Sequence, residues 1–304
     1  MAFGPATPAR LTTLAALAAV LSAPALADDH EGYADVDNEL VPQDQVIELA
    51  DDPEIGSRIS GVIGADIYSH FVSYGQDVWA EGDAFSGSDT LNPYAEIGIA
   101  FDGFDFAVGL WGDVNDNAPE SIGGNIQEID FYLGVSKSFG DLTAGVTYQA
   151  WQFGGGTEHI LDISLGYDDA ALWGDSGFTL APSLTIHNRI GNTANEGVSD
   201  SGTVLVFGAE LPIGIPEDFP VSVSFPVALG IVLEEDYFID GGDSGLGFFS
   251  AGASFGYSLN EIIDPSFGDW SLNAGVTVYV TEEDVYQNPE DTFVVYNFGA
   301  SMAF

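Results

Sequence analysis

The segment Thr292-Phe-Val-Val-Tyr-Asn-Phe-Gly-Ala-Ser-Met-Ala-Phe304 decides the fold, because its side chains alternate strictly in character. Counted back from the last residue, every second side chain is apolar: Phe304, Met302, Ala300, Phe298, Tyr296 and Val294. From Asn297 to Ala303, the side chains between them are small or polar: Ala303, Ser301, Gly299 and Asn297. A period of two places the two sets on opposite faces of a β-strand. The segment is therefore predicted to be a strand with one aromatic, apolar face and one face that tolerates water.

The same alternation recurs along the chain in segments of about ten residues that are separated by turn residues. The predicted strands cover residues 59–68, 91–101, 104–111, 128–136, 142–151, 159–167, 178–189, 203–211, 221–232, 248–259, 270–280 and 292–304. Short turns at Asp102-Gly103 and Gly140-Asp141 contrast with longer loops between other pairs of strands. In lipid, every backbone N–H and C=O must be paired within the protein, and only a closed sheet has no edge. We therefore expect an all-β fold, a closed antiparallel transmembrane barrel of about 12 strands, within a range of roughly 10–14.

Acidic residues dominate the composition, with 48 Asp and Glu against 4 Lys and Arg and a formal net charge of −44. Such a chain lacks the basic surface that nucleic acid requires, so no nucleic-acid partner is expected. Cysteine is absent, which excludes disulfides and thiolate metal sites, and no cofactor is predicted. Self-repulsion of this charge weakens as salt rises, because screening shortens the reach of each charge. The composition therefore predicts a salt-adapted, halophilic source.

The N-terminal residues have the pattern of a secretory signal peptide. Arg10 precedes the apolar run Leu11–Leu21, Pro24 breaks it, and Ala25-Leu26-Ala27 supplies small residues for cleavage. The run is too short for the roughly 20 residues of a transmembrane helix. We assign residues 1–27 to a cleaved signal peptide and residues 57–304 to the barrel.

Residues 28–56 are rich in Asp and Glu around one apolar island, Val46–Ala50. Blocks of like charge usually stay solvated, so this segment is predicted to be an acidic periplasmic tail. A plug or a periplasmic contact is the alternative role.

The signal peptide, the alternating strands and the final Phe304 together resemble a bacterial outer-membrane β-barrel protein. The resemblance implies export through the periplasm to the outer membrane and contact with its lipid and lipopolysaccharide. It also implies that the barrel-assembly machinery reads the last strand through Tyr296, Phe298 and Phe304. Within this class, Ile67–Gly75 and Glu128–Val135 look like the TorF-type putative porins, although the arginine-glycine pair of those proteins is absent here. That narrower resemblance implies a pore.

The inward faces of the predicted strands supply candidate pore-lining residues: Asp66, Glu96, Asp105, Glu128, Asp130, Asp162, His187 and Arg189. If the lumen is open, this mostly acidic set repels anions and favours cations, which predicts a weakly cation-preferring channel for small solutes. About twelve strands lie between the roughly 8 of a filled barrel and the 16–18 of an open porin, so a filled lumen is also compatible with the sequence. The alternative function is a structural or adhesive barrel that acts through its acidic loops.

Two further motifs carry chemistry elsewhere but are interpreted here as turns. Asp113-Val-Asn-Asp-Asn-Ala-Pro119 offers oxygen ligands suited to Ca²⁺, yet Asp and Asn are also the ordinary residues of loops. Gly-Asp-Ser-Gly at 174–177 and 242–245 resembles the nucleophile motif of serine proteases. A catalytic triad also needs a positioned His and an orienting acid, and the four His residues lack that family's flanking residues. We therefore expect neither an enzyme nor a metal site.

Overall fold

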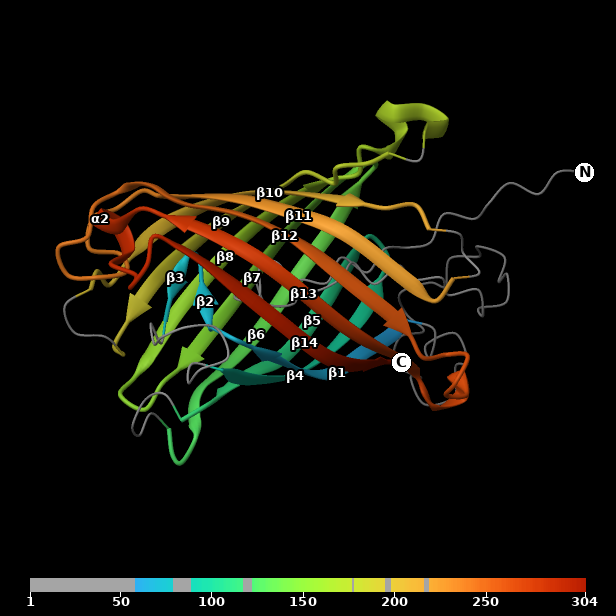
Figure 1. The fold of residues 1–304 in the computed structure, drawn as a ribbon, viewed down its shortest axis with the longest axis horizontal. Coiled ribbons are helices and arrows are strands. Elements are labelled where there is room, and N and C mark those ends of the chain that lie inside the picture. Colours follow the sequence, from blue (N-terminus) through green and yellow to red (C-terminus); the bar gives the residue numbers. More distant parts are fainter. Residues whose placement is uncertain (1–57, 79–88, 117–121, 177, 195–197, 216–218) are drawn as a thin grey trace, which may run out of the picture.

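In the computed structural model, residues 58–78, 89–116, 122–176, 178–194, 198–215 and 219–304 are described. The predicted signal peptide and acidic tail, residues 1–56, lie outside these ranges. Twelve antiparallel strands form one closed sheet, in which β1 (Ile59–Tyr68) pairs with both β4 (Thr90–Phe101) and β14 (Thr292–Ala303) (Figure 1). The closed antiparallel barrel that the alternation predicts is thus confirmed, including its strand number.

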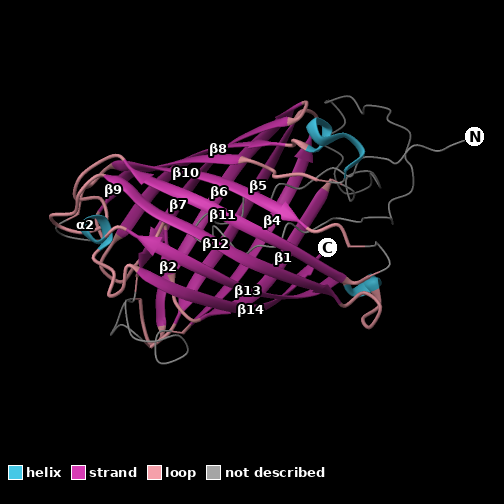
Figure 2. Ribbon diagram, turned by 45° about the horizontal axis from the view of Figure 1, so that its top comes forward, coloured by secondary structure: helices cyan, strands magenta, loops and turns pink. Residues whose placement is uncertain are grey.

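Each remaining wall strand pairs with its neighbours in sequence: β5 (Phe104–Val114), β6 (Ile126–Phe139), β7 (Leu142–Gln152), β8 (Thr157–Tyr167), β9 (Ser183–Asn192), β10 (Gly202–Pro212), β11 (Val221–Val232), β12 (Gly245–Ser258) and β13 (Asp269–Thr281). In the described part of the chain, helical structure is limited to short turns at the two ends of the wall, as Figure 2 shows: η3 (Ala170–Ser176), η4 (Pro265–Phe267) and α2 (Glu283–Tyr286). Within the described ranges, no helix is long and apolar enough to cross a bilayer.

The two ends of the barrel differ in their connections. We call the end where β1 begins and β14 ends the proximal end, and the opposite end the distal end (Figure 1). The proximal end carries the two-residue turns after β4 and β6, where Gly103 and Gly140 take positive φ values of 90° and 67°. It also carries three longer loops, after β8, β10 and β12. The distal end carries α2 and a two-stranded hairpin, β2 (Val72–Ser73) and β3 (Gln76–Asp77).

Side chains alternate across the wall as the sequence indicates. In β14, Tyr296 and Phe298 are 38% and 56% exposed, whereas the intervening Asn297 is buried. Exposed apolar residues continue around the circumference: Ile63, Ile97, Leu110, Phe131, Val146, Ile163, Phe207, Phe225, Phe249 and Val278. An apolar surface that encircles a protein far exceeds the patches of a soluble monomer. The outer face is therefore lipid-facing, and the fold is a transmembrane β-barrel.

Most strand boundaries lie within three residues of their predicted positions, and the largest difference is at the start of β9. The alternation predicts a strand from residue 178, whereas β9 begins at Ser183. The preceding residues are held by Asp169, whose carboxylate accepts hydrogen bonds from the backbone N–H groups of Leu180 and Ala181. Ala181 has a φ of 40°, which breaks the extended path. A side-chain contact ten or more residues away thus overrides the local pattern.

Candidate functional site

The β2–β3 hairpin lies inside the barrel, and we call residues 69–78 the plug. Its turn is Tyr74-Gly75, whose positive φ values of 50° and 95° reverse the chain within the lumen. The Tyr74 ring stacks on His187 of β9 at a centroid distance of 3.8 Å. On the far side of the turn, a Cβ at Gly75 would lie 2.7 Å from the ring of Phe248 in β12. The turn therefore bridges two strands of the wall across the lumen.

Two more aromatic contacts fix the plug against other strands. Phe71 packs on Trp111 of β5 at 5.2 Å, and His70 packs on Phe293 of β14 at 5.9 Å, both between ring centroids. Ser69 also binds the wall, because its hydroxyl accepts a hydrogen bond from the Tyr296 backbone N–H at 2.9 Å. The plug thus contacts four strands of the wall, β5, β9, β12 and β14.

The last distal loop, which contains α2, holds the plug by hydrogen bonds. The Tyr286 hydroxyl donates to the Tyr74 carbonyl at 2.7 Å, and the Asn288 amide donates to the Gly75 carbonyl at 2.9 Å. The Asn288 side-chain oxygen in turn accepts from the Asp77 backbone N–H at 3.0 Å. The turn and the return strand of the plug are therefore both fastened to the same loop.

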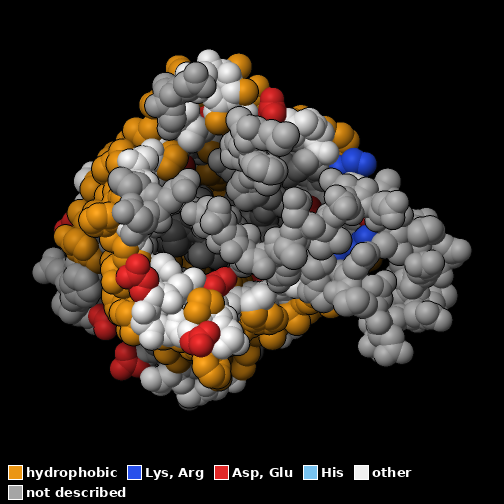
Figure 3. Space-filling model, turned by 90° about the vertical axis from the view of Figure 1, so that its right-hand side faces the viewer, with side chains coloured by type: hydrophobic (Ala, Val, Ile, Leu, Met, Phe, Trp, Pro, Cys, Tyr) orange, Lys and Arg blue, Asp and Glu red, His pale blue; other side chains and the backbone are white. Residues whose placement is uncertain are grey.

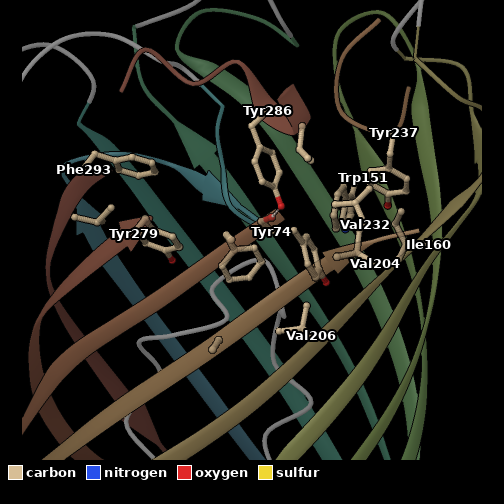
Figure 4. Packing of buried hydrophobic residues seen from close by; sticks show 14 residues of the cluster. Tyr74, Trp151, Ile160, Val204, Val206, Val232, Tyr237, Tyr279, Tyr286 and Phe293 are labelled. Carbon is tan, nitrogen blue, oxygen red and sulfur yellow. Dashed lines mark hydrogen bonds between the residues drawn. The ribbon is translucent and has the colours of Figure 1, made fainter. Parts of the chain in front are cut away.

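An apolar cluster surrounds the plug and fills the distal half of the lumen. In Figure 4, Tyr74 lies between Tyr279 and Phe293 on one side and Trp151 and Tyr237 on the other. Its other buried members are Ile160, Val204, Val206, Ala228, Val232, Phe248, Val285, Tyr286 and Val295. The strand number alone was compatible with either an open or a filled lumen. The structure shows that the distal half of the lumen is filled.

The side chains that line the proximal half of the lumen are small and polar, and water can reach them. Ser183 and Ser222 lie on inward rows and are exposed, and Thr143 and Ser164 on their inward rows are half-buried. Because inward side chains become exposed toward this end, solvent enters the barrel from the proximal side. The lumen is thus a vestibule that ends at the plug.

All eight candidate pore-lining residues lie on inward rows of the wall. Asp66 accepts a hydrogen bond from the Asn273 amide at 2.9 Å, and Glu96 accepts one from the Tyr132 hydroxyl at 3.0 Å. Asp105 lies opposite Ser136 near the proximal rim and is exposed. The other five are buried farther toward the distal end.

One wall of the lumen carries carboxylates that are paired with basic groups. On β8 and β9, Asp162 lies 2.7 Å from His187 Nδ1, and Glu158 accepts from Arg189 Nε at 3.1 Å. The Arg189 guanidinium also donates to the Tyr237 carbonyl at 2.6 Å and lies 4.1 Å from the centre of that ring. Arg189 therefore joins the wall to the distal loop between β11 and β12.

The wall on β4, β5 and β6, which we call the acidic wall, also carries buried carboxyl groups, and Glu128 and Asp130 form no ion pair with a basic side chain of the described residues. Glu128 and Asp130 are each 3% exposed and interact electrostatically with each other and with Asp113. The Asp130 Oδ1 atom is buried and makes no hydrogen bond in the described structure. Coulomb repulsion among buried like charges is strong, so this wall favours any cation or proton that reaches it.

The Asp113–Pro119 segment is described only as far as residue 116. The Asp113 carboxylate accepts hydrogen bonds from Thr90 and from the Asn115 amide at 2.9 and 3.0 Å. Among the described residues, no three His, Cys, Asp or Glu side chains are placed to hold a metal ion. The Gly-Asp-Ser-Gly segments lie apart: the described part of the first, residues 174–176, lies in η3 at the proximal end, and the second, residues 242–245, enters β12 at the distal end.

Sequence reasoning did not find the plug, Glu158 or the role of Tyr286. The Tyr74-Gly75 pair is a recognisable turn signal, but it does not indicate which way the loop folds. Glu158 immediately precedes the predicted strand 159–167, and its inward position follows from the same alternation that placed Asp162. The Tyr286–Tyr74 bond joins residues 212 positions apart, which no local pattern reports.

Comparisons with known proteins add little to this geometry. Neither the protein-family models nor the curated proteins give a match. Among solved structures, the chain is similar to LpxR from Salmonella typhimurium, with 9% identity, a TM-score of 0.44, and 79% of this chain and 99% of that one covered. It is also similar to the outer membrane channel DcaP of Acinetobacter baumannii, with 8% identity, a TM-score of 0.35 and coverage of 81% and 96%. A third is outer membrane phospholipase A from Escherichia coli, with 8% identity, a TM-score of 0.37 and coverage of 82% and 96%. At this level of similarity, function has to be inferred from the chain's own residues.

Proposed function

We propose that the protein is an outer-membrane channel for small solutes, weakly selective for cations, whose plug closes it in the conformation described. The observation that carries the proposal is that a separate hairpin, docked among side chains of the wall and the distal loops, completes the closure of the distal lumen. Twelve strands enclose more space than the roughly 8 strands of a side-chain-filled barrel. A short segment held by a few hydrogen bonds is also the kind of element that opens locally. Its displacement would connect the vestibule to the distal side.

The distribution of charge supports the preference for cations. The whole chain has only 4 Lys and Arg residues, of which Arg10 lies in the predicted leader. Arg58 and Lys137 lie at the proximal end, and Arg189 is engaged by Glu158. No lysine or arginine is therefore left to neutralise Glu128 and Asp130. A lumen lined by one sign of charge concentrates ions of the opposite sign.

The orientation of the barrel follows from its two ends. We infer that the proximal end, where the predicted tail joins the barrel, faces the periplasm, and that the acidic distal loops face outward toward lipopolysaccharide. The outward aromatic row that ends in Tyr296, Phe298 and Phe304 is the part we assign to recognition by the assembly machinery.

A non-conducting structural or adhesive barrel is the second candidate function. It is favoured by how firmly the plug is packed, since aromatic contacts and hydrogen bonds to α2 both hold it. In that case the barrel would display its distal loops and transport nothing.

Conductance of the refolded protein in planar bilayers separates these functions. The informative pair is the full barrel and a variant in which residues 70–77 are replaced by a short Gly-Ser linker. The channel proposal expects rare openings of the full barrel, steady conductance of the variant, and a reversal potential that shows cation preference. A correctly folded variant that stays silent would reject the channel in favour of the structural barrel. Conductance with anion preference would reject the proposal that Glu128 and Asp130 make the lumen selective for cations.

A further inference from the structure

Among the described residues, Arg58 and Lys137 both lie beside one turn of the proximal rim. The Arg58 guanidinium lies 3.6 Å from the Asp102 carboxylate, and a Cβ at the neighbouring Gly103 would lie 3.5 Å from Lys137 Nζ. Both bases therefore lie beside the β4–β5 turn. Figure 3, which views this end, shows the blue Lys and Arg side chains on one side of the rim and the red carboxylates mostly on the other.

The same place is the edge of the lipid-facing belt. Lys137 follows the outward row Ile129, Phe131, Leu133 and Val135 along β6, and its ammonium lies 5.5 Å from the centre of the Phe139 ring. Phe101 and Phe104 stack beside the turn at 4.9 Å, and both are exposed. A lysine whose stem lies on apolar side chains at the edge of such a belt directs its charge to the headgroup layer.

We propose that this turn binds the headgroup of one phospholipid from the leaflet at the proximal end. Lys137 and Arg58 hold the phosphate, and the acyl chains lie on the outward Phe104, Phe106 and Val135. This inference requires that the barrel spans a membrane, and it is independent of whether the barrel conducts.

Charge complementarity selects the class of headgroup. Asp102 is paired with Arg58 in the turn that Lys137 also approaches, and Asp141 occupies the next proximal turn, so the site carries acids as well as bases. A net-anionic headgroup is repelled by a chain with a formal charge of −44, over a distance of about 8–10 Å at moderate salt. A zwitterionic headgroup with a primary amine adds no net charge. Its phosphate meets Lys137, and its ammonium donates hydrogen bonds to Asp102, which a quaternary amine is unable to do. The occupant is therefore a phosphatidylethanolamine-type lipid.

Native mass spectrometry of the intact refolded barrel tests this site. The barrel is exposed to equal amounts of phosphatidylethanolamine, phosphatidylglycerol and phosphatidylcholine with identical acyl chains, and the retained lipid is identified. We expect phosphatidylethanolamine to be retained most, and Lys137→Gln to lower that retention about two- to fivefold, as the loss of one partly exposed charge contact predicts.

The control variants separate the loss of lipid binding from a general change in charge and from misfolding. Lys137→Arg preserves the phosphate contact and should retain the lipid, and Asp264→Asn, in the loop between β12 and β13, should leave retention unchanged. Heat-modifiable migration in gels confirms that each variant is folded. Equal retention by the folded Lys137→Gln barrel and the wild type overturns the site. Retention of phosphatidylglycerol above phosphatidylethanolamine overturns the assignment of a zwitterionic headgroup.

Discussion

Phe304 lies across Gly61 on the lipid-facing side of the seam that closes the barrel. The two residues exchange backbone hydrogen bonds of 2.8 and 2.9 Å, and a Cβ at position 61 would collide with the Phe304 ring. The ring therefore occupies the space that a side chain at position 61 would need. An aromatic residue that covers a glycine on the next strand helps to fix strand register, and here it does so where the first and last wall strands meet.

We expect Phe304→Ala to weaken this seam. Cross-strand pairs of this kind contribute up to about 1 kcal/mol, so the free energy of unfolding should fall by roughly that amount. Phe298→Ala is the matched control, because Phe298 is equally exposed on the same outward row but faces no glycine on β1. Urea unfolding in lipid vesicles measures both. An equal loss in the two variants would mean that the ring acts only through its contact with lipid.

The plug should open when its turn is enlarged. Gly75→Val places a side chain against Phe248 and onto a backbone with a φ of 95°, which we expect to weaken docking by about 1–3 kcal/mol. The open fraction in single-channel recordings should then rise roughly five- to hundredfold. Gly241→Val is the control, since Gly241 has a φ of 79° but open space around it. If both variants open equally, the effect comes from backbone strain and not from the contact with Phe248.

Arg189 should matter far more to stability than the other arginine of the barrel. Its pair with Glu158 is buried, and removing one partner of such a pair typically costs about 3–5 kcal/mol. Arg189→Met should therefore destabilise the barrel by that order and release the Tyr237 loop. Arg58→Met breaks an exposed pair and should cost less than about 1 kcal/mol. Thermal unfolding of the two variants compares them directly, and similar losses would contradict the assignment of Arg189 as the link between wall and loop.

Removing one carboxyl from the acidic wall should stabilise the barrel and reduce its selectivity. Asp130→Asn relieves the electrostatic repulsion with Glu128 and can keep a hydrogen bond between the two side chains, so we expect about 1 kcal/mol of added stability. In the plug-deleted barrel, the same change should move the reversal potential toward zero. Asp264→Asn, outside the lumen, should change neither quantity. If Asp130→Asn leaves the reversal potential unchanged, this wall does not line the permeation path.

The wall of the barrel is predictable because a strand between lipid and lumen must alternate at every step. That constraint is local, so Ile63, Phe131 and Phe298 report the outward face from the sequence alone. It also places Asp66 and Asp162 on the inward face, since inward rows follow from outward ones. What the rows do not report is which inward groups meet across the lumen.

The plug was missed because its position depends on contacts between distant parts of the chain. Asp77 bonds Asn288 across 211 positions, and Tyr74 meets His187 only after the wall has closed. The local sequence of residues 69–78 indicates a turn between two short segments. That pattern fits a loop that extends away from the barrel as well as one that folds into the lumen. The direction is set by Trp111, Phe248 and Phe293, whose large side chains sit on inward rows at the distal end.

The proximal loop after β8 should keep its structure in acid. Burial of Asp169 acts to raise its pKa, but hydrogen bonds from Thr179, Trp173 and two backbone N–H groups outweigh this and hold the pKa well below its usual range. A depressed pKa contributes stability that is fully present above the unfolded value of about 3.9 and is lost only as pH falls through the folded value. Amide exchange at Leu180 and Ala181, corrected for intrinsic rates, should therefore stay slow from pH 7 to about 4. Asp169→Asn should speed it already at pH 7, and a loss of protection in the wild type near pH 4–5 would contradict the depressed pKa.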